Sequence, residues 1–391
     1  MKITKYFLAA AGLGVIPSCE GQFDSEVGGP CTITLAAGDD IQDAIDIANN
    51  NDVICLGAGV YLPTGTINVN KPIELRGPQS NVDPRTSCGS ARTDETSEAV
   101  VNGGGLPTIF DISADDVTID GLTIKNASVD MIQSNQAIAI ANTNIRFNII
   151  TEAGDEGLQL RNCASCVVEY NLVIDIAQDG INMCCDSSDG VIQFNEVHDI
   201  GSDNAAIYVY DADSISITDN YVYDVSSNDG IKMGDGGCGS QKAPNGSIER
   251  NVVRDTVQDG ITVYSSSTVV MDNEIYNSMS ENGALFISCA GTQDVTVTGN
   301  VIYNNGGSTV GVQIGSAIAS NTASILVNNN CIQGNAQGMV NDATDTNDID
   351  ATDNWWGADD GPGGVNTGSG DSVSTKVDFS PFLVTAPEKC Q

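Results

Sequence analysis

The chain has 391 residues, of which 42 are glycine and 5% are aromatic. This composition favours many short strands and turns over a bundle of long amphipathic helices. The formal net charge is −37 at pH 7. Such a field repels the phosphates of nucleic acids, so we exclude a nucleic acid as partner. The field also repels acidic polysaccharides, unless calcium or a local basic patch intervenes.

Residues 1–18 are typical of a bacterial export signal. Two lysines precede an apolar run over residues 6–16, which is too short to span a bilayer. The motif VIPSC resembles a lipobox, in which the cysteine, here Cys19, carries the lipid. Pro17 is unusual in that motif, and ordinary cleavage near Ser18 is the alternative.

We therefore expect an exported protein, located at the bacterial cell surface as an outer-membrane lipoprotein or released outside the cell. Residues 19–30 would be the tether, and the lipid would be the sole contact with the membrane. The 12 cysteines then lie in an oxidising compartment, and we expect several disulfides, including Cys31 with Cys55. Stacked repeats could bring four further cysteines together: Cys163, Cys166, Cys184 and Cys185. A zinc site is disfavoured, because the chain has one histidine.

An asparagine returns along the chain every 22 to 31 residues, and a glycine, once an alanine, follows it 8 to 11 residues later. The asparagines are Asn148, Asn171, Asn195, Asn220, Asn251, Asn273, Asn300, Asn330 and Asn354. Each repeat contains three short alternating segments, such as those over 214–218, 220–223 and 230–233, and period-two alternation is the signature of a strand. One repeat cannot bury its apolar positions alone, so successive repeats must stack.

These features predict an all-β fold: a single-stranded parallel β-helix of about ten coils, stacked at about 4.8 Å. We expect the asparagines to lie at inward turns, where their amides can bond along the stack. We expect the glycines to occupy turns that require a positive φ.

From Thr32 to Pro387, this organisation resembles the right-handed parallel β-helix proteins of the pectin-lyase-like group, with PbH1-type repeats. The apolar face of residues 40–50 resembles the family's N-terminal capping helix. The motifs DNWWG and VDFSPF resemble its closing segment, here a C-terminal cap over 353–387. We interpret Trp355 and Trp356 as part of that cap, with a sugar-stacking platform as the alternative.

The predicted β-helix covers residues 31–387, with a tail over 388–391. Residues 78–98 lack alternation and predict a loop excursion between early coils, pinned by Cys88. Since the core of a β-helix is closed, any function must lie on the columns of side chains that point outward.

Alternation predicts which side chains point outward. The second residue after each repeat glycine should do so: Gln159, Asn182, Tyr208, Lys232, Thr262, Leu285 and Gln313. Two residues on, Arg161, Tyr210 and Tyr264 share that face. Aromatic rings cover apolar sugar faces and polar groups bind hydroxyls, so this face suits a glycan. The predicted substrate-binding residues are Tyr208, Tyr210, Tyr264, Arg161 and Asn182. Stacked exterior tyrosines are the structural alternative, which we prefer for a second column: His198, Tyr223, Arg254, Tyr276 and Tyr303.

The catalytic candidates are Lys232, Asp229 and Asp259. In a polysaccharide lyase, Lys232 or a tyrosine would accept the proton next to the uronate, and Arg161 or calcium would neutralise the carboxylate. In a glycosidase, Asp229 and Asp259 on adjacent coils would stand near the ~5 Å that retention requires. An aspartate before glycine is also ordinary turn chemistry.

Two functions therefore remain open. The first is an exported protein that binds or processes a polysaccharide or cell-surface glycan, as a polysaccharide lyase or a glycoside hydrolase. The second is a non-catalytic, adhesin-like or structural surface protein. Calcium is the one cofactor we consider, and the aspartates over residues 342–353 are dense in oxygen ligands but lack the ordered spacing of an EF-hand.

Overall fold

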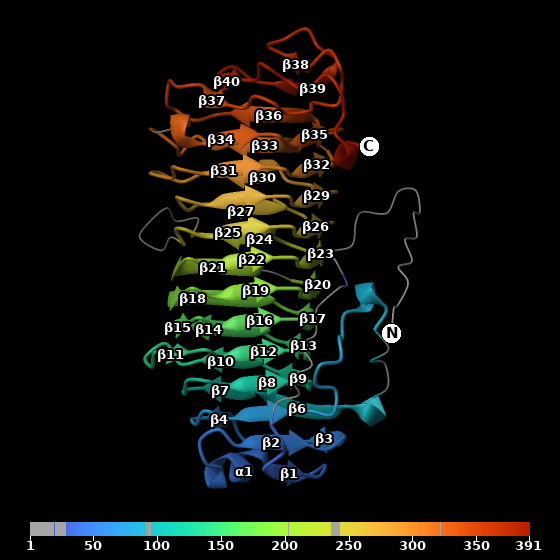
Figure 1. Cartoon of the computed structure of the whole chain (residues 1–391), viewed down its shortest axis with the longest axis vertical. Helices are drawn as coiled ribbons and strands as arrows, with labels where there is room; N and C mark the ends of the chain where they lie inside the picture. The colour runs from blue at the N-terminus through green and yellow to red at the C-terminus, as the bar shows by residue number, and fades with distance from the viewer. Residues whose placement is uncertain are drawn as a thin grey trace.

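The structure is a computed structural model that describes residues 19, 29–90, 92, 95–201, 203–235, 243–307, 309–320 and 322–391. The predicted signal and most of the predicted tether lie outside these residues. Figure 1 shows the strands stacked in successive coils along one long axis, from α1 and β1 at one end to β38, β39 and β40 at the other. The chain is thus a parallel β-helix, as predicted.

In the described residues, three parallel sheets run along this axis. Sheet A has 14 strands: β1 (Ile33–Leu35), β2 (Val53–Leu56), β5 (Glu74–Arg76), β8 (Thr118–Asp120), β12 (Asn144–Arg146), β16 (Val167–Glu169), β19 (Val191–Gln193), β22 (Ser216–Thr218), β25 (Ser247–Glu249), β28 (Val269–Met271), β31 (Thr296–Thr298), β34 (Leu326–Asn328), β37 (Ile349–Asp350) and β40 (Val377–Asp378). Sheet B has 11 strands: β3 (Gly59–Tyr61), β6 (Ala99–Leu106), β9 (Thr123–Ala127), β13 (Ile149–Ala153), β17 (Leu172–Ile176), β20 (Glu196–Ile200), β23 (Tyr221–Val225), β26 (Val252–Arg254), β29 (Glu274–Tyr276), β32 (Val301–Tyr303) and β35 (Cys331–Gln333).

Sheet C has 15 strands in the same residues: β4 (Ile67–Val69), β7 (Phe110–Ile112), β10 (Ile132–Ser134), β14 (Leu158–Arg161), β18 (Ile181–Ser188), β21 (Ala205–Asp213), β24 (Asp229–Met233), β27 (Ile261–Val263), β30 (Gly283–Ile287), β33 (Val310–Ile314), β36 (Gln337–Asn341), β39 (Gly370–Val373) and β38 (Pro362–Gly364), with β11 (Ile140–Ala141) and β15 (Cys163–Ala164) beside this path. A coil contributes one strand to each sheet in turn. The 14 strands of sheet A mean that about ten coils was too few. The asparagine repeat begins at Asn148, and earlier coils lack it; Leu122 stands one coil below Asn148 and donates its N–H to the Asn148 Oδ1.

The repeat asparagines form a buried ladder at the turn from sheet A to sheet B, as predicted. Each Oδ1 accepts hydrogen bonds from the asparagine one coil earlier, without a break from Asn148 to Asn354. The Asn220 Oδ1, for example, accepts from the Asn195 N at 2.9 Å and from the Asn195 Nδ2 at 3.0 Å. The ladder satisfies backbone groups at a turn that water cannot reach.

The repeat glycines do not adopt a positive φ, so that prediction was wrong. The positive φ falls instead on the residue before each asparagine, for example 57° at Asp219. The glycines are required for close packing: a Cβ on Gly180 would lie 2.7 Å from the Val197 Cγ1 and 2.8 Å from the Ala206 carbonyl oxygen. The glycine therefore lets the turn from sheet B to sheet C approach the next coil.

Both ends of the core are covered. At the N-terminal end, α1 (Ile41–Ile47) begins after Asp40, whose carboxylate accepts from the backbone N–H groups of Gln42 and Asp43, and it buries an apolar face. At the C-terminal end, Trp356 is fully buried. Trp355 packs with Cys331 and Cys390, which are bonded to each other, so the predicted tail is attached to the cap. The burial of both tryptophans supports their role as a cap.

The predicted excursion over residues 78–98 contains two short 3-10 helices, η1 (Thr86–Cys88) and η2 (Glu95–Ser97). It returns over the outer face of sheet B and binds the fully buried carboxylate of Glu196. This carboxylate accepts from the Thr86 Oγ1 at 2.7 Å and from the Ser87 N and Oγ at 2.9 and 2.8 Å. The excursion therefore occupies part of sheet B, and the outer face of sheet C is the better candidate for function.

The disulfides differ in part from the prediction. Cys31 bonds to Cys55, as expected, and Cys19 bonds to Cys88. Cys163 bonds to Cys166 within a single turn rather than across coils. Of the cysteines that the structure describes, Cys184 and Cys185 are the ones without a disulfide. No helix in the described residues has the length and apolar character that crossing a membrane requires.

Replacing Asn220 with alanine is expected to destabilise the fold. The change removes an acceptor for two N–H groups of Asn195 and a donor to the Ile192 carbonyl oxygen. A buried polar group without a partner costs about 1–3 kcal/mol, so we expect a loss of about 2–5 kcal/mol in the free energy of unfolding. Denaturant unfolding followed by circular dichroism measures this loss. Asn50→Ala, at an exposed turn, is the control, and equal midpoints for both variants would contradict the role of the ladder.

Candidate functional site

The outward row of sheet C is nearly the one that alternation predicts. Strand register places Gln159 beside Asn182, Asn182 beside Tyr208, Tyr208 beside Lys232, and Lys232 beside Thr262. Leu285 was predicted wrongly. It is fully buried and pairs with Ile261, and Phe286 takes the outward position beside Thr262. The coil that contains Gly283 has one residue more between its glycine and the outward position, which shifts the alternation there, and Gln313 in the next coil is again outward beside Phe286.

Lys232 is half-buried between two aromatic rings. Its Nζ lies 5.3 Å from the centroid of the Tyr208 ring and 5.7 Å from that of Tyr264, within reach of a cation–π interaction with each. The Tyr208 ring stacks on Tyr210 at 4.6 Å, and Tyr264 meets Phe286 edge-on at 6.0 Å. We call Tyr208, Tyr210, Lys232 and Tyr264 the lysine cage. With the described residues, the Lys232 ammonium makes no hydrogen bond or salt bridge.

Four predicted site residues therefore lie together, while the accessibility of the cage is uneven. Tyr208 is only 4% exposed, whereas Tyr210, Lys232 and Tyr264 are half-buried. Burial raises the pKa of Tyr208 and Tyr264 above the ordinary value of a phenol. Both phenols are therefore neutral at physiological pH, as donors of a proton must be.

The predicted pair Asp229 and Asp259 is buried beneath this surface, at 4% and 2% exposure. The Asp229 Oδ1 accepts from the Asp259 N–H at 3.2 Å, and the Asp259 Oδ2 accepts from the Thr262 hydroxyl at 3.0 Å. Asp179 has an equivalent position, since its carboxylate accepts from the backbone N–H groups of Asn204 and Ala205. The contacts of Asp229 and Asp179 link one coil to the next, the contact with Thr262 lies within one coil, and all are the turn chemistry that the Asp-Gly-Ile motif allows.

A group of three carboxylates lies near the other end of the row, and the sequence did not reveal it. Asp130, Asp155 and Glu156 offer oxygens within 4.8 Å of one another, at the turns that precede β10 and β14. Burial first, and then a hydrogen bond and repulsion from Asp130, raise the pKa of Glu156 to about 9. The signal was present in part, because Asp155 and Glu156 stand directly before a repeat glycine, whereas Asp130 belongs to the earlier turn, which lacks the glycine.

Gln159 borders these carboxylates. Its Nε2 donates to the Glu156 Oε1 at 2.9 Å, but its own Oε1 is buried without a hydrogen-bond partner. The Asn182 Oδ1, one strand on, is also buried and unpartnered. Carboxylates together with a neutral carbonyl oxygen form the donor set that calcium prefers. We call Asp130, Asp155, Glu156 and Gln159 the oxygen cluster.

Arg161 lies next to the oxygen cluster and away from Lys232. It is half-buried on β14, its Nη1 lies 3.4 Å from the Gln133 Oε1, and its charge lowers the pKa of Asp111 and Asp155 against the upward effect of burial. Of the predicted substrate-binding residues, Arg161 and Asn182 thus adjoin the oxygen cluster, and the three tyrosines form the lysine cage.

The aspartates over residues 342–353 bind their neighbours instead of converging. Asp345 accepts from Thr322, Asp342 accepts from Gln313, and Asp350 accepts from Asn328. We searched the described residues for three or more carboxylates, thiols or imidazoles close enough to hold one metal ion. Only the carboxylates of the oxygen cluster meet this condition there. The second outward column packs as predicted, with His198 stacked on Tyr223 at 4.4 Å and Tyr276 on Tyr303 at 5.0 Å.

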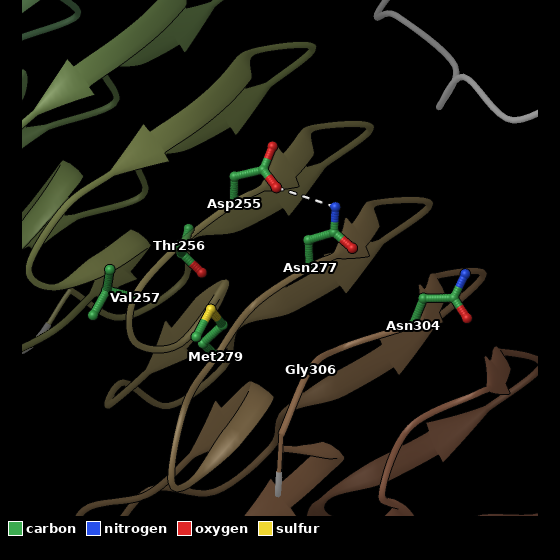
Figure 2. Close-up of a pocket in the computed structure, with 7 residues that line it drawn as sticks. All are labelled: Asp255, Thr256, Val257, Asn277, Met279, Asn304 and Gly306. Carbon is green, nitrogen blue, oxygen red and sulfur yellow. Dashed lines mark hydrogen bonds between the residues drawn. The ribbon is translucent and has the colours of Figure 1, made fainter.

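A pocket of about 350 Å³ lies at the turns from sheet B to sheet C. Figure 2 shows Val257 and Met279 on one side of it and Asn277 and Asn304 on the other. Its carboxylate, on Asp255, accepts a hydrogen bond from Asn277 at 3.1 Å. The pocket offers apolar surface and amides but no pair of acid and base, so its lining supports no catalysis.

Comparison with known proteins agrees with this architecture. The family described as "right handed beta helix region" matches residues 98–245 and 238–370. No curated protein matches the chain.

Solved structures share the fold at low sequence identity. The A-module of the mannuronan C-5 epimerase AlgE4 of Azotobacter vinelandii is 15% identical, with a TM-score of 0.57 over 78% of this chain and 94% of that one. An alginate lyase of Paenibacillus sp. str. FPU-7 is 17% identical, with a TM-score of 0.52 over 77% of this chain and 95% of that one. DFA-IIIase of Arthrobacter chlorophenolicus A6 without its lid is 12% identical, with a TM-score of 0.59 over 88% and 92%.

The buried Asp229 predicts how stability depends on pH. Burial first, and then the neighbouring Asp259 carboxylate, raise its pKa to about 7. An unfolded aspartate titrates near pH ~3.9, so between about pH 4 and 7 the unfolded chain has released a proton that the folded chain retains. Stability must therefore fall as pH rises through this window.

Asp229→Asn removes this titration, and its amide oxygen can still accept from the Asp259 N–H. We expect the variant to lose less stability than the wild type between about pH 4 and 7. Denaturation midpoints over a pH series measure the difference. Asp224→Asn, at an exposed position, should follow the wild type, and equal pH profiles for Asp229→Asn and the wild type would show that Asp229 does not titrate in this range.

Proposed function

Because the chain belongs to the right-handed β-helix family, we propose that it is an exported protein that binds an acidic, uronate-containing polysaccharide along the outer face of sheet C. Lys232 accepts the proton at C5 of a uronate residue. The single observation that carries this proposal is the position of the Lys232 side-chain nitrogen, which lies between the rings of Tyr208 and Tyr264 without a hydrogen bond or salt bridge to the described residues.

Proton removal next to a uronate carboxylate needs three groups: a base, a group that neutralises the carboxylate, and an acid. In the proposed reaction Lys232, in its neutral form, takes the C5 proton. The electron pair of the C–H bond forms the C4–C5 double bond, and the glycosidic C4–O bond breaks. A tyrosine hydroxyl of the lysine cage donates a proton to the departing oxygen. Delivery of a proton to the opposite face of C5, without cleavage, would instead invert that carbon.

The net charge of −37 requires a means to hold an acidic polymer. We propose that the oxygen cluster binds a calcium ion through Asp130, Asp155, Glu156 and the free carbonyl oxygen of Gln159. A bound cation would relieve the repulsion between these carboxylates and would attract a uronate carboxylate. Arg161 adds a second positive charge nearby. The uronate polymers in the names of the epimerase and the alginate lyase are compatible with this substrate class.

A glycosidase that uses Asp229 and Asp259 is less well supported. Both carboxylates are almost completely buried and accept hydrogen bonds from the next coil, Asp229 from Asp259 and Asp259 from Ser280, so a sugar could contact them only if the coil opened. A non-catalytic, adhesin-like protein would need the same outer face but no base, and the experiments below distinguish it.

The proposal of export rests on the disulfides, which form in oxidising compartments. The lipid anchor is a separate matter, because the Cys19 sulfur bonds to Cys88 in this structure. A lipid thioether needs the same sulfur, so a lipidated chain would leave Cys88 without this partner. The Cys19–Cys88 disulfide is therefore compatible with cleavage without lipidation. Lipidation of Cys19 would exclude this disulfide.

Replacing Lys232 with alanine should reduce kcat/KM on a uronate polymer by about 10²–10⁴-fold, the usual contribution of a positioned base. Lys232→Arg retains the charge and the ring contacts, but a guanidinium cannot accept the proton. It should therefore bind the polymer and fail to react. Absorbance of the unsaturated product measures cleavage, and deuterium uptake at C5 in heavy water measures proton removal without cleavage.

Lys389→Ala is the matched control, because this lysine is exposed at the C-terminal cap, where it contacts the Gly299 carbonyl oxygen. It should react like the wild type. Binding without cleavage or deuterium uptake by the wild type would favour the adhesin-like function. New reducing ends without an unsaturated product would favour a hydrolase, and full activity of Lys232→Ala would refute the role of Lys232.

Calcium should raise the melting temperature of the wild type, since a ligand that binds only the folded state adds about 2.7 kcal/mol at 100 times its Kd. Asp130→Asn and Glu156→Gln should greatly reduce the shift, while Asp345→Asn, in the run over residues 342–353 that does not converge, should retain it. Thermal unfolding in calcium, in magnesium and in a chelator measures the effect. An equal shift for Glu156→Gln and the wild type would place calcium elsewhere.

A further inference from the structure

Two adjacent cysteines stand apart from the others in the chain. Of the 11 cysteines that the structure describes, nine are disulfide-bonded, and Cys184 and Cys185 are not. Both are buried in β18, at 0% and 8% exposure. Two neighbouring free thiols are unexpected in a protein whose other described cysteines are bonded, because an oxidising environment favours disulfides.

The backbone turns both thiols toward the same side of sheet C. In a regular strand, adjacent side chains point to opposite faces, which would send Cys185 into the core. Instead, the register with β21 shifts between Cys184 and Ser187, and Cys185 has a φ of 60°. The register sets Cys184 between Arg161 and Tyr210 in the outward row, and the Cys185 Sγ lies 3.8 Å from the Tyr210 hydroxyl. The bulge thus brings the second thiol back beside the first.

The two sulfurs are close enough to interact. The Cys184 thiol donates a hydrogen bond to the Cys185 sulfur, and this bond lowers the pKa of Cys185 to about 7 and raises that of Cys184, which burial raises further. Cys185 is therefore the thiol that ionises more readily, and a thiolate is the form that attacks a disulfide.

From this geometry we propose that Cys184 and Cys185 form a reversible vicinal disulfide on the outer side of sheet C. The oxidant is a disulfide donor, such as oxidised glutathione or a dithiol oxidase of the same compartment. The Cys185 thiolate attacks one sulfur of the donor and forms a mixed disulfide, while the first donor thiol departs. The Cys184 thiol then loses its proton, attacks the Cys185 sulfur and releases the second donor thiol. Two electrons and two protons pass from the cysteines to the donor.

The vicinal disulfide should be the most easily reduced in the protein. Adjacent Cα atoms are about 3.8 Å apart, whereas ordinary disulfides join Cα atoms at about 4.4–6.8 Å. The closed ring is therefore strained, and strained disulfides are the labile ones. By contrast, the Cα atoms of the bonded pairs Cys31–Cys55 and Cys163–Cys166 are 5.6 and 5.9 Å apart.

Oxidation should also change the lysine cage. It removes the sulfur contact of the Tyr210 hydroxyl, and Tyr210 stacks on Tyr208, which covers Lys232. If the proposed function is right, the oxidised and reduced forms should differ severalfold in their affinity for a uronate polymer. This consequence rests on the proposed function, but the formation of the disulfide does not.

The sequence offers a clean chemical test. Cleavage before Asp179 and Asp186 releases the peptide DGINMCC, which contains both cysteines and no other. Full-length protein is treated with oxidised glutathione, alkylated in denaturant without reductant and digested. The mass of the peptide is then measured by mass spectrometry. We expect an unalkylated peptide, lighter than the dithiol peptide by two hydrogen atoms. A low concentration of dithiothreitol before alkylation should then add two alkyl groups to this peptide while Cys163 and Cys166 stay bonded.

Two single-cysteine variants test whether the donor reaches the thiols. Cys184→Ser and Cys185→Ser should each leave one thiol that takes glutathione as a mixed disulfide. If the wild-type peptide carries two alkyl groups after glutathione treatment, both cysteines have stayed reduced, and this result would overturn the proposal. Reduction of Cys163–Cys166 before this pair would also overturn it, because the strained ring must open first. If the ring forms but the glycan affinity is the same in both states, the link to Tyr210 is wrong and the covalent site stands.

Discussion

The structure depends on one constraint: every coil must satisfy its buried backbone and apolar groups through the coils above and below it. The asparagine ladder meets this constraint at the turn from sheet A to sheet B, where the Asn220 Oδ1 accepts two hydrogen bonds from Asn195 and the Asn251 Oδ1 accepts two from Asn220. The aspartates of the Asp-Gly-Ile motif meet it at the turn from sheet B to sheet C. Both sets of groups are inside the stack, so they stabilise the fold and leave the chemistry to the outer faces.

The outer faces differ in what covers them. On sheet B the buried Glu196 carboxylate holds residues of the excursion that lie more than a hundred positions earlier in the chain. On sheet C the outward row combines half-buried side chains, such as Arg161, Lys232 and Tyr210, with buried ones, such as Asn182 and Thr262. The oxygen cluster, the adjacent cysteines and the lysine cage follow one another along successive strands from β14 to β27 (Figure 1). A polymer that lies along the axis of the stack would therefore pass over the oxygen cluster and the lysine cage, with the buried cysteines beneath it.

The sequence predicted what repeats and missed what joins distant segments. Periodicity assigned the ladder and most of the outward row, because each depends on neighbours at a fixed spacing, whereas the caps were assigned from their resemblance to the end segments of the family. It could not find the bond of Glu196 to the excursion or the approach of Asp130 to Glu156, since these depend on how loops of irregular length fold. It also failed where one residue changes the phase, as at Leu285 and Phe286, and where a turn bonds to itself, as at Cys163 and Cys166. The glycines were located correctly but explained wrongly: steric closeness, not a positive φ, requires them.

The partners of the lysine and arginine side chains also favour sheet C as the functional face. In the described residues, most cations are bound to acidic or carbonyl partners: Arg146 pairs with Asp120, Arg250 pairs with Asp219, and Lys376 donates to backbone carbonyl oxygens near the C-terminal cap. With so many carboxylates available, a lysine at a random surface position would find one. Lys232 has aromatic rings on two sides, and Asp229, the acid nearest to it along its strand, is buried and accepts from a backbone N–H. The Lys232 ammonium thus forms no salt bridge with the described residues, although its charge lowers the pKa of the buried Asp229 against the effect of burial, and a cation without a salt-bridge partner suits a ligand of opposite charge.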